Sequence, residues 1–478
     1  MSDFDLVIIG TGSGNSILTP EFEDWNVAIV ERSVFGGTCL NAGCIPSKMF
    51  VIPADRMVEA AEATERLDVD IEARGADWPA MRDRVFGRID PIAAGGTEYR
   101  HSQEHVTVLH GDGRFVGDHR LAVRSIDGTT TEITADRFVL AAGARPRLPD
   151  VAGLAGTPFH TSDSIMRIAE LPDHLIILGG GFIAAEMGHV FASLGSRVSV
   201  VHRGDRMLRH EDPDVSKRFT DTFCKRVDTY FHAETTQVEH RDGRFVLSID
   251  QEREAVQLPG HRYCSELHGD ALLVTTGRDP NGDQLAVTET GVQLDHHGYV
   301  ITDDTLATGV PGIWALGDIR NPLQLKHLAN SEQRVVTHNL LHPHSPISID
   351  QRVVPHAVFS HPQVGSVGST VIELRAQGRM FIEGRCDYAG VAYGWALEDT
   401  TGFAKVLIDA ADATILGAHI IGPQAATLIQ QIAQAMQFGI TADRLAREQI
   451  WCHPALPELL ENALLDALAQ MPVQLPAR

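Results

Sequence analysis

Two cysteines five positions apart, Cys39 and Cys44, are the residues of this sequence best suited to chemistry. They lie in the stretch FGGTCLNAGCIPSK, residues 35–48. Such a pair could be a structural disulfide, part of a metal site or a redox-active pair. No second cysteine pair exists to complete a zinc site, because the remaining cysteines are scattered singly. A disulfide that closes so short a loop also removes little entropy from the unfolded chain, so redox chemistry is the favoured interpretation.

The local sequence favours a reactive thiol at Cys44. The segment TCLNAGCIPSKMF is predicted to be helical near Cys44, which would place this thiol at a helix N-terminus with Lys48 nearby. Both features lower the pKa of a thiol. The ring that the two cysteines would close is small, so their disulfide would be easily reduced. The sequence therefore predicts a reducible redox pair.

Length and composition limit the classes of protein to consider. The chain has 478 residues, of which 43% are hydrophobic and 22% charged, and its length suggests several domains. A formal net charge of −23 argues against a nucleic-acid or anionic-membrane partner, because there is no basic field to release counterions. The sequence shows neither a signal peptide nor a long apolar span, so we expect a cytoplasmic protein, whose thiols stay reduced.

An internal similarity predicts two dinucleotide-binding units. Residues 5–17 and 174–186 each read as a continuous apolar strand followed by a glycine-rich turn that should open a helix. Buried parallel strands have such unbroken apolar runs. A further strand signal at 312–318 is expected to complete the first unit.

The pattern changes after about residue 345. Residues 352–368 and 402–422 are typical of strands in an antiparallel sheet, and 424–439 has apolar side chains at helical spacing. Core packing explains that apolar stripe, and a subunit interface is the alternative; its members are Leu428, Ile429, Ile432, Ala433 and Met436. The expected fold is α/β, with two doubly wound, Rossmann-like domains and a C-terminal α+β domain. The expected domain boundaries are 1–150, 151–271, 272–342 and 343–478.

The first unit carries part of a dinucleotide fingerprint. Gly10 and Gly12 would let backbone N–H groups approach a pyrophosphate at a helix N-terminus. Glu31 ends the next strand, where a carboxylate can accept hydrogen bonds from ribose hydroxyls. Asn15 stands where the third glycine is usual, which is a departure from the pattern.

The second unit matches the fingerprint through Gly179, Gly181 and Ala184, and its next strand ends without an acid. His202 and Arg203 stand there instead, with Arg209 downstream. Arginines at this position favour the 2′-phosphate of NADPH over NADH. The alternative is a solvated basic turn.

Together with two nucleotide units, the run GGTCLNAGC resembles the flavin-dependent pyridine nucleotide–disulfide oxidoreductases, a family that includes glutathione, lipoamide and mycothione enzymes. The resemblance spans essentially the whole chain. It implies FAD in the first unit, completed by 272–342, NADPH in the second, and a homodimer formed through 343–478. It places Asp318 at the ribityl and pyrophosphate region, and Lys48 with Glu186 as an ion pair beside the flavin ring.

The resemblance also implies catalytic roles. Cys44 would lie nearer the flavin, Cys39 would attack the substrate disulfide, and His453 with Glu458 would form an acid–base dyad that reaches the partner subunit's cysteines. On the FAD side we expect further contacts from Ser13, Gly14, Gly37, Thr38, Gly113, Ala142 and Gly143. On the NADPH side we expect them from Phe182 and Gly277. No metal is expected.

The substrate is expected to be a small disulfide. Glutathione reductases carry arginines on the helix after the first glycine turn, whereas here Glu21, Glu23 and Asp24 occupy that stretch, and Pro20 should shorten or break the helix. These features resemble mycothione reductases, which reduce mycothiol disulfide. An NAD-linked dihydrolipoamide dehydrogenase is the main alternative. A mercuric reductase would need a C-terminal cysteine pair, which 471–478 lacks, and a flavin-binding redox scaffold would not need both cysteines and His453.

Overall fold

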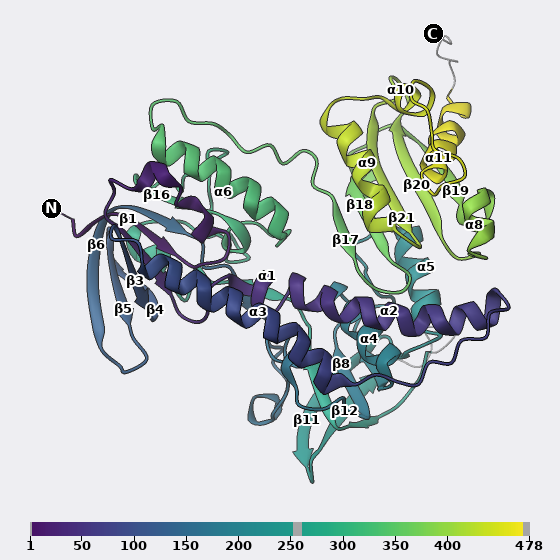
Figure 1. Ribbon diagram of the computed structural model, residues 1–478, viewed down its shortest axis with the longest axis horizontal. Coiled ribbons are helices and arrows are strands. Elements are labelled where there is room, and N and C mark those ends of the chain that lie inside the picture. The colour runs from purple at the N-terminus through teal and green to yellow at the C-terminus, as the bar shows by residue number, and fades with distance from the viewer. Residues whose placement is uncertain (1, 252–260, 472–478) are drawn as a thin grey trace.

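The structure, a computed structural model, describes residues 2–251 and 261–471. The C-terminal residues that bear on a mercuric reductase lie largely outside this range. Two α/β units and a C-terminal domain are arranged along the molecule (Figure 1). No helix within these ranges combines the length and apolarity needed to cross a membrane.

The first unit is a seven-stranded sheet. Its parallel strands, in spatial order, are β3 (Val106–His110), β2 (Val27–Glu31), β1 (Phe4–Ile9), β6 (Thr130–Leu140) and β16 (Ile313–Ala315). An antiparallel extension on β6 consists of β5 (Arg120–Arg124) and β4 (Asp112–Gly117). The late strand β16 confirms that the signal at 312–318 completes this unit. Its covering helices include α3 (Trp78–His101) and α6 (Lys326–Leu341).

The second unit has a four-stranded parallel sheet, β10 (Asp228–Tyr230), β9 (Arg197–Val201), β8 (His174–Leu178) and β14 (Ala271–Val274). The sheet continues to Val274, so the boundary expected at 271 falls on the first residue of a strand. Beside it lie α4 (Phe182–Leu194), α5 (Pro213–Phe223) and a three-stranded sheet, β11 (Ala233–Arg241), β12 (Arg244–Gln251) and β13 (Glu266–Gly269). A short pair, β7 (Ala144–Pro146) and β15 (Arg278–Pro280), connects this unit to the first.

The C-terminal domain has the expected antiparallel sheet. Its strands, in spatial order, are β17 (His356–Val358), β18 (Val364–Gly368), β21 (Ile415–Ile421), β20 (Phe403–Asp409) and β19 (Phe381–Asp387). Its helices are α7 (Val371–Ala376), α8 (Ala392–Ala396), α9 (Ala425–Gln437), α10 (Ala442–Arg447) and α11 (Glu458–Ala469). The apolar stripe of α9 is buried within this domain, which confirms core packing.

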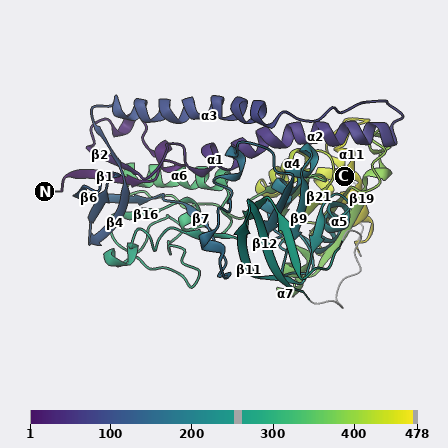
Figure 2. The ribbon, with the colours of Figure 1, turned by 90° about the horizontal axis from the view of Figure 1, so that it is seen from below.

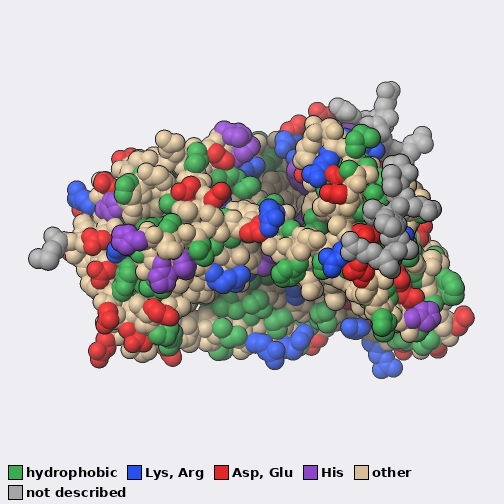
Figure 3. Space-filling model, turned by 90° about the horizontal axis from the view of Figure 1, so that it is seen from above, with side chains coloured by type: hydrophobic (Ala, Val, Ile, Leu, Met, Phe, Trp, Pro, Cys, Tyr) green, Lys and Arg blue, Asp and Glu red, His purple; other side chains and the backbone are tan. Residues whose placement is uncertain are grey.

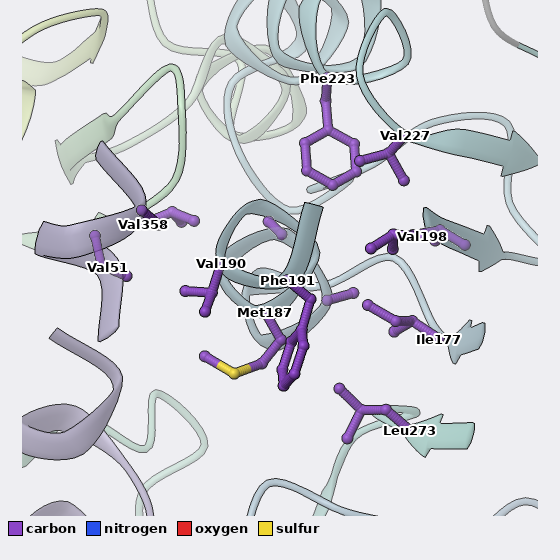
Figure 4. Close-up of a cluster of buried hydrophobic side chains, with 14 of the residues drawn as sticks. Val51, Ile177, Met187, Val190, Phe191, Val198, Phe223, Val227, Leu273 and Val358 are labelled. Atoms are coloured by element: carbon purple, nitrogen blue, oxygen red, sulfur yellow. The ribbon is translucent and has the colours of Figure 1, made fainter. Parts of the chain in front are cut away.

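Helix α4 forms the centre of the core of the second unit. Its apolar side chains pack on Ile177 of β8 and Val198 of β9, and also on Val51 and Val358 from the neighbouring units (Figure 4). The apolar periodicity of α4 therefore buries one helix against three parts of the chain.

Helix α2 (Cys44–Arg66) connects all three parts of the molecule. It begins in the first unit and runs, with α3, along one side of the molecule (Figure 2). Asp55 Oδ1 lies 2.8 Å from His189 Nε2 of α4, and Glu62 Oε1 lies 2.8 Å from His361 Nε2 of the C-terminal domain.

The helix expected after the first glycine turn is an error of the sequence prediction. Only 3-10 turns are present there, at Gly14–Ile17 and Pro20–Phe22. Pro20 cannot continue a helix that begins at Gly14, because its ring clashes with the preceding turn and it has no N–H to donate. The expectation that Pro20 shortens or breaks this helix agrees with the structure.

A polar row crosses the C-terminal sheet where that sheet faces the second unit. The register aligns one residue from each strand, in the order His356, Ser366, His419, Lys405 and Arg385. Three acids of the second unit meet this row at the start of α5. Glu211 forms hydrogen bonds with His356 and Ser366. Asp212 Oδ1 and Asp214 Oδ2 lie 3.0 and 2.7 Å from Lys405 Nζ. The two parts therefore dock through buried charges.

These pairings determine the charge states in the row. Burial opposes the charged form of His356, but its hydrogen bond to Glu211 outweighs burial and raises its pKa. Burial also opposes a charged Lys405, and its bonds to Asp214 and Asp212 again prevail and raise its pKa. Both cations are therefore held by their acidic partners.

We predict that Lys405→Ala destabilises the protein by about 3–5 kcal/mol, because it leaves the buried carboxylate of Asp212 without its cation. The measurement is the midpoint of thermal unfolding, which should fall by several degrees. Lys217→Ala, which breaks an exposed pair with Asp221, is the matched control and should cost under about 1 kcal/mol. Equal midpoints for the two variants would contradict a stabilising role of the polar row.

Candidate active site

A cavity of about 2800 Å³ runs between the three parts of the molecule. Figure 3 shows the molecule hollowed between its first unit and its C-terminal domain. The cavity is lined by the glycine turn after β1, the segment with both cysteines, the start of α4 and the strands β17 and β18. One space thus contains groups that are far apart in sequence.

The two cysteines open into this cavity. Cys39 lies on α1 (Gly37–Asn41), and Cys44 is the first residue of α2, as the sequence predicts. Both are free thiols, and they share a hydrogen bond. That hydrogen bond raises the pKa of Cys39, together with burial. It lowers the pKa of Cys44 to about 7, helped by a backbone N–H and Lys48. Cys44 is therefore the thiolate of the reduced pair, and Cys39 donates to it.

Lys48 and Glu186 form an ion pair in the cavity wall. Lys48 Nζ lies 2.6 Å from Glu186 Oε2, and the carboxylate of Glu186 is almost fully buried. The backbone N–H of Phe359 donates to Glu186 Oε1 at 3.1 Å, and the Phe359 ring lies 4.3 Å from Lys48 Nζ. Phe359 thus contacts both members of the pair. Lys48 lies one turn along α2 from Cys44.

Most residues expected at FAD line this cavity: Gly10, Gly12, Ser13, Glu31, Gly37, Thr38, Lys48, Gly113, Ala142, Gly143 and Asp318. The glycines fit a large ligand. A Cβ on Gly37 would lie 2.7 Å from Gly12 Cα, so the two backbones are in contact with no side chain between them. The cavity wall at this point therefore consists of backbone alone. Gly14 is the exception, because it packs against Ala141 and Ile8 and does not line the cavity.

Two carboxylates of the cavity wall suit a ligand with hydroxyl groups. Glu31 accepts hydrogen bonds from the N–H and Oγ1 of Thr11, at 2.9 and 2.6 Å, so it is oriented at the end of β2. Asp318 accepts no hydrogen bond from another described residue, and burial raises the pKa of its carboxyl. A polyol chain could donate to Asp318. The residues present therefore fit FAD.

The glycine turn of the second unit has the geometry of a nucleotide-binding turn. Gly179 has φ +122°, and a Cβ there would lie 2.5 Å from the carbonyl oxygen of Thr275. Gly181 precedes α4, and a Cβ there would meet nothing within 4 Å. Of the residues expected at NADPH, Phe182 lines the cavity, whereas Gly179, Gly181, Ala184, His202, Arg203, Arg209 and Gly277 do not.

The structure argues against a charged His202. Its ring packs on Gly180 and Gly204, and burial, with the nearby Arg209, lowers its pKa to about 4. The ring is therefore neutral near pH 7 and supplies no charge to a phosphate. Arg203 and Arg209 are both solvent-exposed, so they are the charged groups among the three residues expected at the 2′-phosphate end.

His453 and Glu458 are paired, but away from the cavity. His453 Nδ1 lies 2.7 Å from Glu458 Oε1, and the imidazole is 70% exposed. Neither residue lines the cavity that contains the cysteines. Within the described chain the dyad therefore does not meet the redox pair.

Lys326 lines the cavity and was missed by the sequence interpretation. Its neighbours in sequence, Leu-Lys-His, form no motif. Only the packing of α6 on the glycine turn brings it to the cavity, so no local signal could have revealed it.

Two family models match the chain. Residues 4–334 match "Pyridine nucleotide-disulphide oxidoreductase", and residues 354–464 match the dimerisation domain of the same family. Together they cover the two units and the C-terminal domain described above.

Individual proteins are similar over nearly their whole length. A mycothione reductase of Mycobacterium tuberculosis is 44% identical over 97% of this chain and 99% of its own. A dihydrolipoyl dehydrogenase of Chlamydia muridarum is 31% identical over 98% of each chain. Among solved structures, a Cu(II) complex of the HOCl-induced flavoprotein disulfide reductase RclA from Escherichia coli superposes with a TM-score of 0.83. It is 26% identical over 97% of this chain and 99% of that one.

We predict that Cys44 of the reduced protein reacts with iodoacetamide with a pH midpoint near 7, since its pKa is lowered and only the thiolate reacts. Cys39→Ala removes the strongest cause of that shift. The midpoint should then rise by about 1–2 pH units, the equivalent of one hydrogen bond to a charged group. Alkylation rates located by tandem mass spectrometry measure it.

Cys39→Ser is the control, because its hydroxyl can still donate and should keep most of the shift. Superimposable rate profiles for Cys39→Ala and the unmodified sequence would contradict the assigned hydrogen bond.

Proposed function

The chain belongs to the pyridine nucleotide–disulphide oxidoreductase family, and from this premise we propose that it is an NADPH-dependent mycothione reductase. It is a flavoprotein disulfide reductase whose family uses FAD and a pyridine nucleotide. The observation that carries the proposal is the Cys39–Cys44 dithiol, which opens into one cavity with the Lys48–Glu186 pair. The proposed substrate is mycothiol disulfide. Because the proposed electron donor is NADPH, we place the reaction in the cytoplasm.

In this proposal each domain binds one cofactor or forms the subunit interface. Residues 1–150 and 272–342 would hold FAD, 151–271 would hold NADPH, and 343–478 would form the homodimer. FAD, when bound, relays two electrons from the pyridine nucleotide to the cysteine disulfide. Gly10, Gly12, Glu31 and Asp318 would hold its nucleotide and ribityl parts, and the Lys48–Glu186 pair would lie beside its ring.

The thiol chemistry follows from the pKa difference within the pair. Cys39, deprotonated as it reacts, attacks one sulfur of the substrate disulfide and forms a mixed disulfide, while the first mycothiol leaves as a thiolate. Cys44, already a thiolate, then attacks Cys39 Sγ and releases the second mycothiol. The cysteines end as a disulfide, so two electrons have passed to the substrate, and two protons complete the two product thiols.

The dyad transfers those protons, one taken from Cys39 as it reacts and one taken from solvent. We assign His453 as the acid and base, held in orientation by Glu458 Oε1 at 2.7 Å. Because the dyad lies away from the cavity of its own chain, the His453 that serves a given redox pair comes from the second subunit of the dimer.

The substrate assignment depends on the residues around the shortened first turn. Glu21, Glu23 and Asp24 are exposed, and no basic side chain accompanies them between residues 14 and 25. None of these three residues lines the cavity, but a disulfide that approached over this surface would meet like charges if it carried the carboxylates of glutathione. Mycothiol carries neutral inositol and glucosamine-derived groups, which require hydroxyl-compatible partners only.

The test is NADPH oxidation by the purified protein with mycothiol disulfide, lipoamide and glutathione disulfide in turn. We expect a clear preference for mycothiol disulfide. Cys39→Ser is the matched control, because serine cannot form the mixed disulfide, and it should abolish turnover. Preference for lipoamide with NADH as donor would favour a dihydrolipoamide dehydrogenase instead, in line with the 31% identical relative.

We predict that Arg203→Ala and Arg209→Ala each reduce the preference for NADPH over NADH by about one to two decades, the value of one hydrogen bond to a charged group. The measurement is kcat/KM for both nucleotides. Lys225→Ala, which removes an exposed cation elsewhere on the second unit, is the control and should leave the ratio unchanged. An unchanged ratio in both arginine variants would rule out the assigned phosphate contacts.

A further inference from the structure

The glycine turns of the two units lead into different elements. In the second unit, β8 leads into α4, a helix of 13 residues. In the first unit, β1 leads only into a 3-10 turn of 4 residues, Gly14–Ile17. A helix N-terminus attracts phosphate because the peptide dipoles of several turns are aligned behind it. The turn after β1 has no such row of dipoles.

Side chains of other helices hold this turn in place. Ser13 Oγ lies 3.0 Å from Asn330 Oδ1, and Gln333 Nε2 donates to the carbonyl of Ser16 at 2.9 Å. Arg100, buried at the end of α3, donates to Asn15 Oδ1 and to its carbonyl oxygen, at 2.7 and 2.5 Å. The turn is therefore fixed by α6 and α3, which replace the internal bonds of a helix.

Helix α6 also places a cation at this turn. Lys326 is its first residue, and Nζ donates to Ser13 Oγ at 2.8 Å. The ammonium is half-buried, and within the described residues no carboxylate lies within 4 Å of it. Asp318 is close enough for the charge of Lys326 to act on the pKa of its carboxyl, but the two side chains form no ion pair. The ammonium can therefore still attract a negatively charged occupant of the cavity.

The surroundings specify the part of FAD that this charge meets. Ser13 and Gly12 belong to the turn that approaches a dinucleotide pyrophosphate, and Gly37 leaves the wall bare opposite Gly12. Lys326 lines the same cavity between this turn and Asp318, whose carboxylate suits a hydroxyl-bearing neighbour. The diphosphate is the part of FAD that carries negative charge and lies next to the ribityl chain.

We propose that Lys326 neutralises the diphosphate of bound FAD and so replaces the positive charge that a full helix N-terminus would supply. The assignment rests on FAD as the cofactor of the proposed function, but not on the identity of the disulfide substrate or on NADPH.

The experiment measures the release of FAD from the holoenzyme by the rise in flavin fluorescence, at several NaCl concentrations. Lys326→Gln keeps most of the side-chain length but removes the charge, and should release FAD about 10- to 100-fold faster at low salt, as for one charged hydrogen bond. The difference should shrink as salt screens the charge. Lys326→Arg should stay near the original rate, and Lys217→Gln, an exposed cation distant in sequence, is the control.

The reduction potential of the bound flavin separates the diphosphate from the flavin ring. Faster release at an unchanged potential supports the proposal. Unchanged release, or a lowered potential without faster release, overturns it, because the cation would then act on the ring or on nothing in FAD. If Lys326→Arg released FAD as fast as Lys326→Gln, charge would not be the cause and the proposal would also fail. If the protein did not reduce mycothiol disulfide, the proposed substrate would be refuted. The FAD-release experiment would still test the role of Lys326.

Discussion

The carboxylate of Glu186 is where the three parts of the molecule meet at the redox site. One oxygen accepts from Lys48 on α2 of the first unit, and the other accepts from the backbone N–H of Phe359, at the exit of β17. Glu186 itself belongs to α4 of the second unit. A buried carboxylate requires such partners, because an unpaired one would be strongly disfavoured. The position of Lys48, and with it the start of α2 at Cys44, therefore depends on all three parts being docked.

Much of the fold was predictable because its signals are local. Continuous apolar runs before glycine turns identified both parallel sheets, and the strand-like segments 352–368 and 402–422 identified the C-terminal sheet. The redox pair was also predictable, since Cys39 and Cys44 are close in sequence and α2 begins at Cys44. The first helix was predicted wrongly, because the strand-and-glycine pattern carried more weight than Pro20. The neutral state of His202 was not predictable, because its burial against Gly180 arises from packing that no sequence motif reports.

The cavity shows how an acidic protein can bind phosphate. The chain has a net charge of −23, yet Lys48 and Lys326 line one cavity together with Arg278. Electrostatic energy in a partly buried site is determined by neighbours within a few ångströms, because the low local dielectric strengthens near charges and bulk solvent screens distant ones. The net charge therefore governs the solubility of the protein and the long-range approach of its substrates, and leaves local recognition to a few cations.

The contacts of α2 have a consequence for the order in which the protein matures during synthesis. Its anchor in the C-terminal domain joins Glu62 to His361, which are 299 positions apart. At a synthesis rate of about 5–20 residues per second, roughly 15–60 s pass between the emergence of the two residues. Throughout that interval Cys39 and Cys44 exist in a chain whose α2 lacks its distal anchor and whose Glu186 lacks Phe359. The chain therefore carries its reactive thiols on the ribosome before the site that activates them is complete, and the newborn protein acquires its redox chemistry only when its last domain has been made.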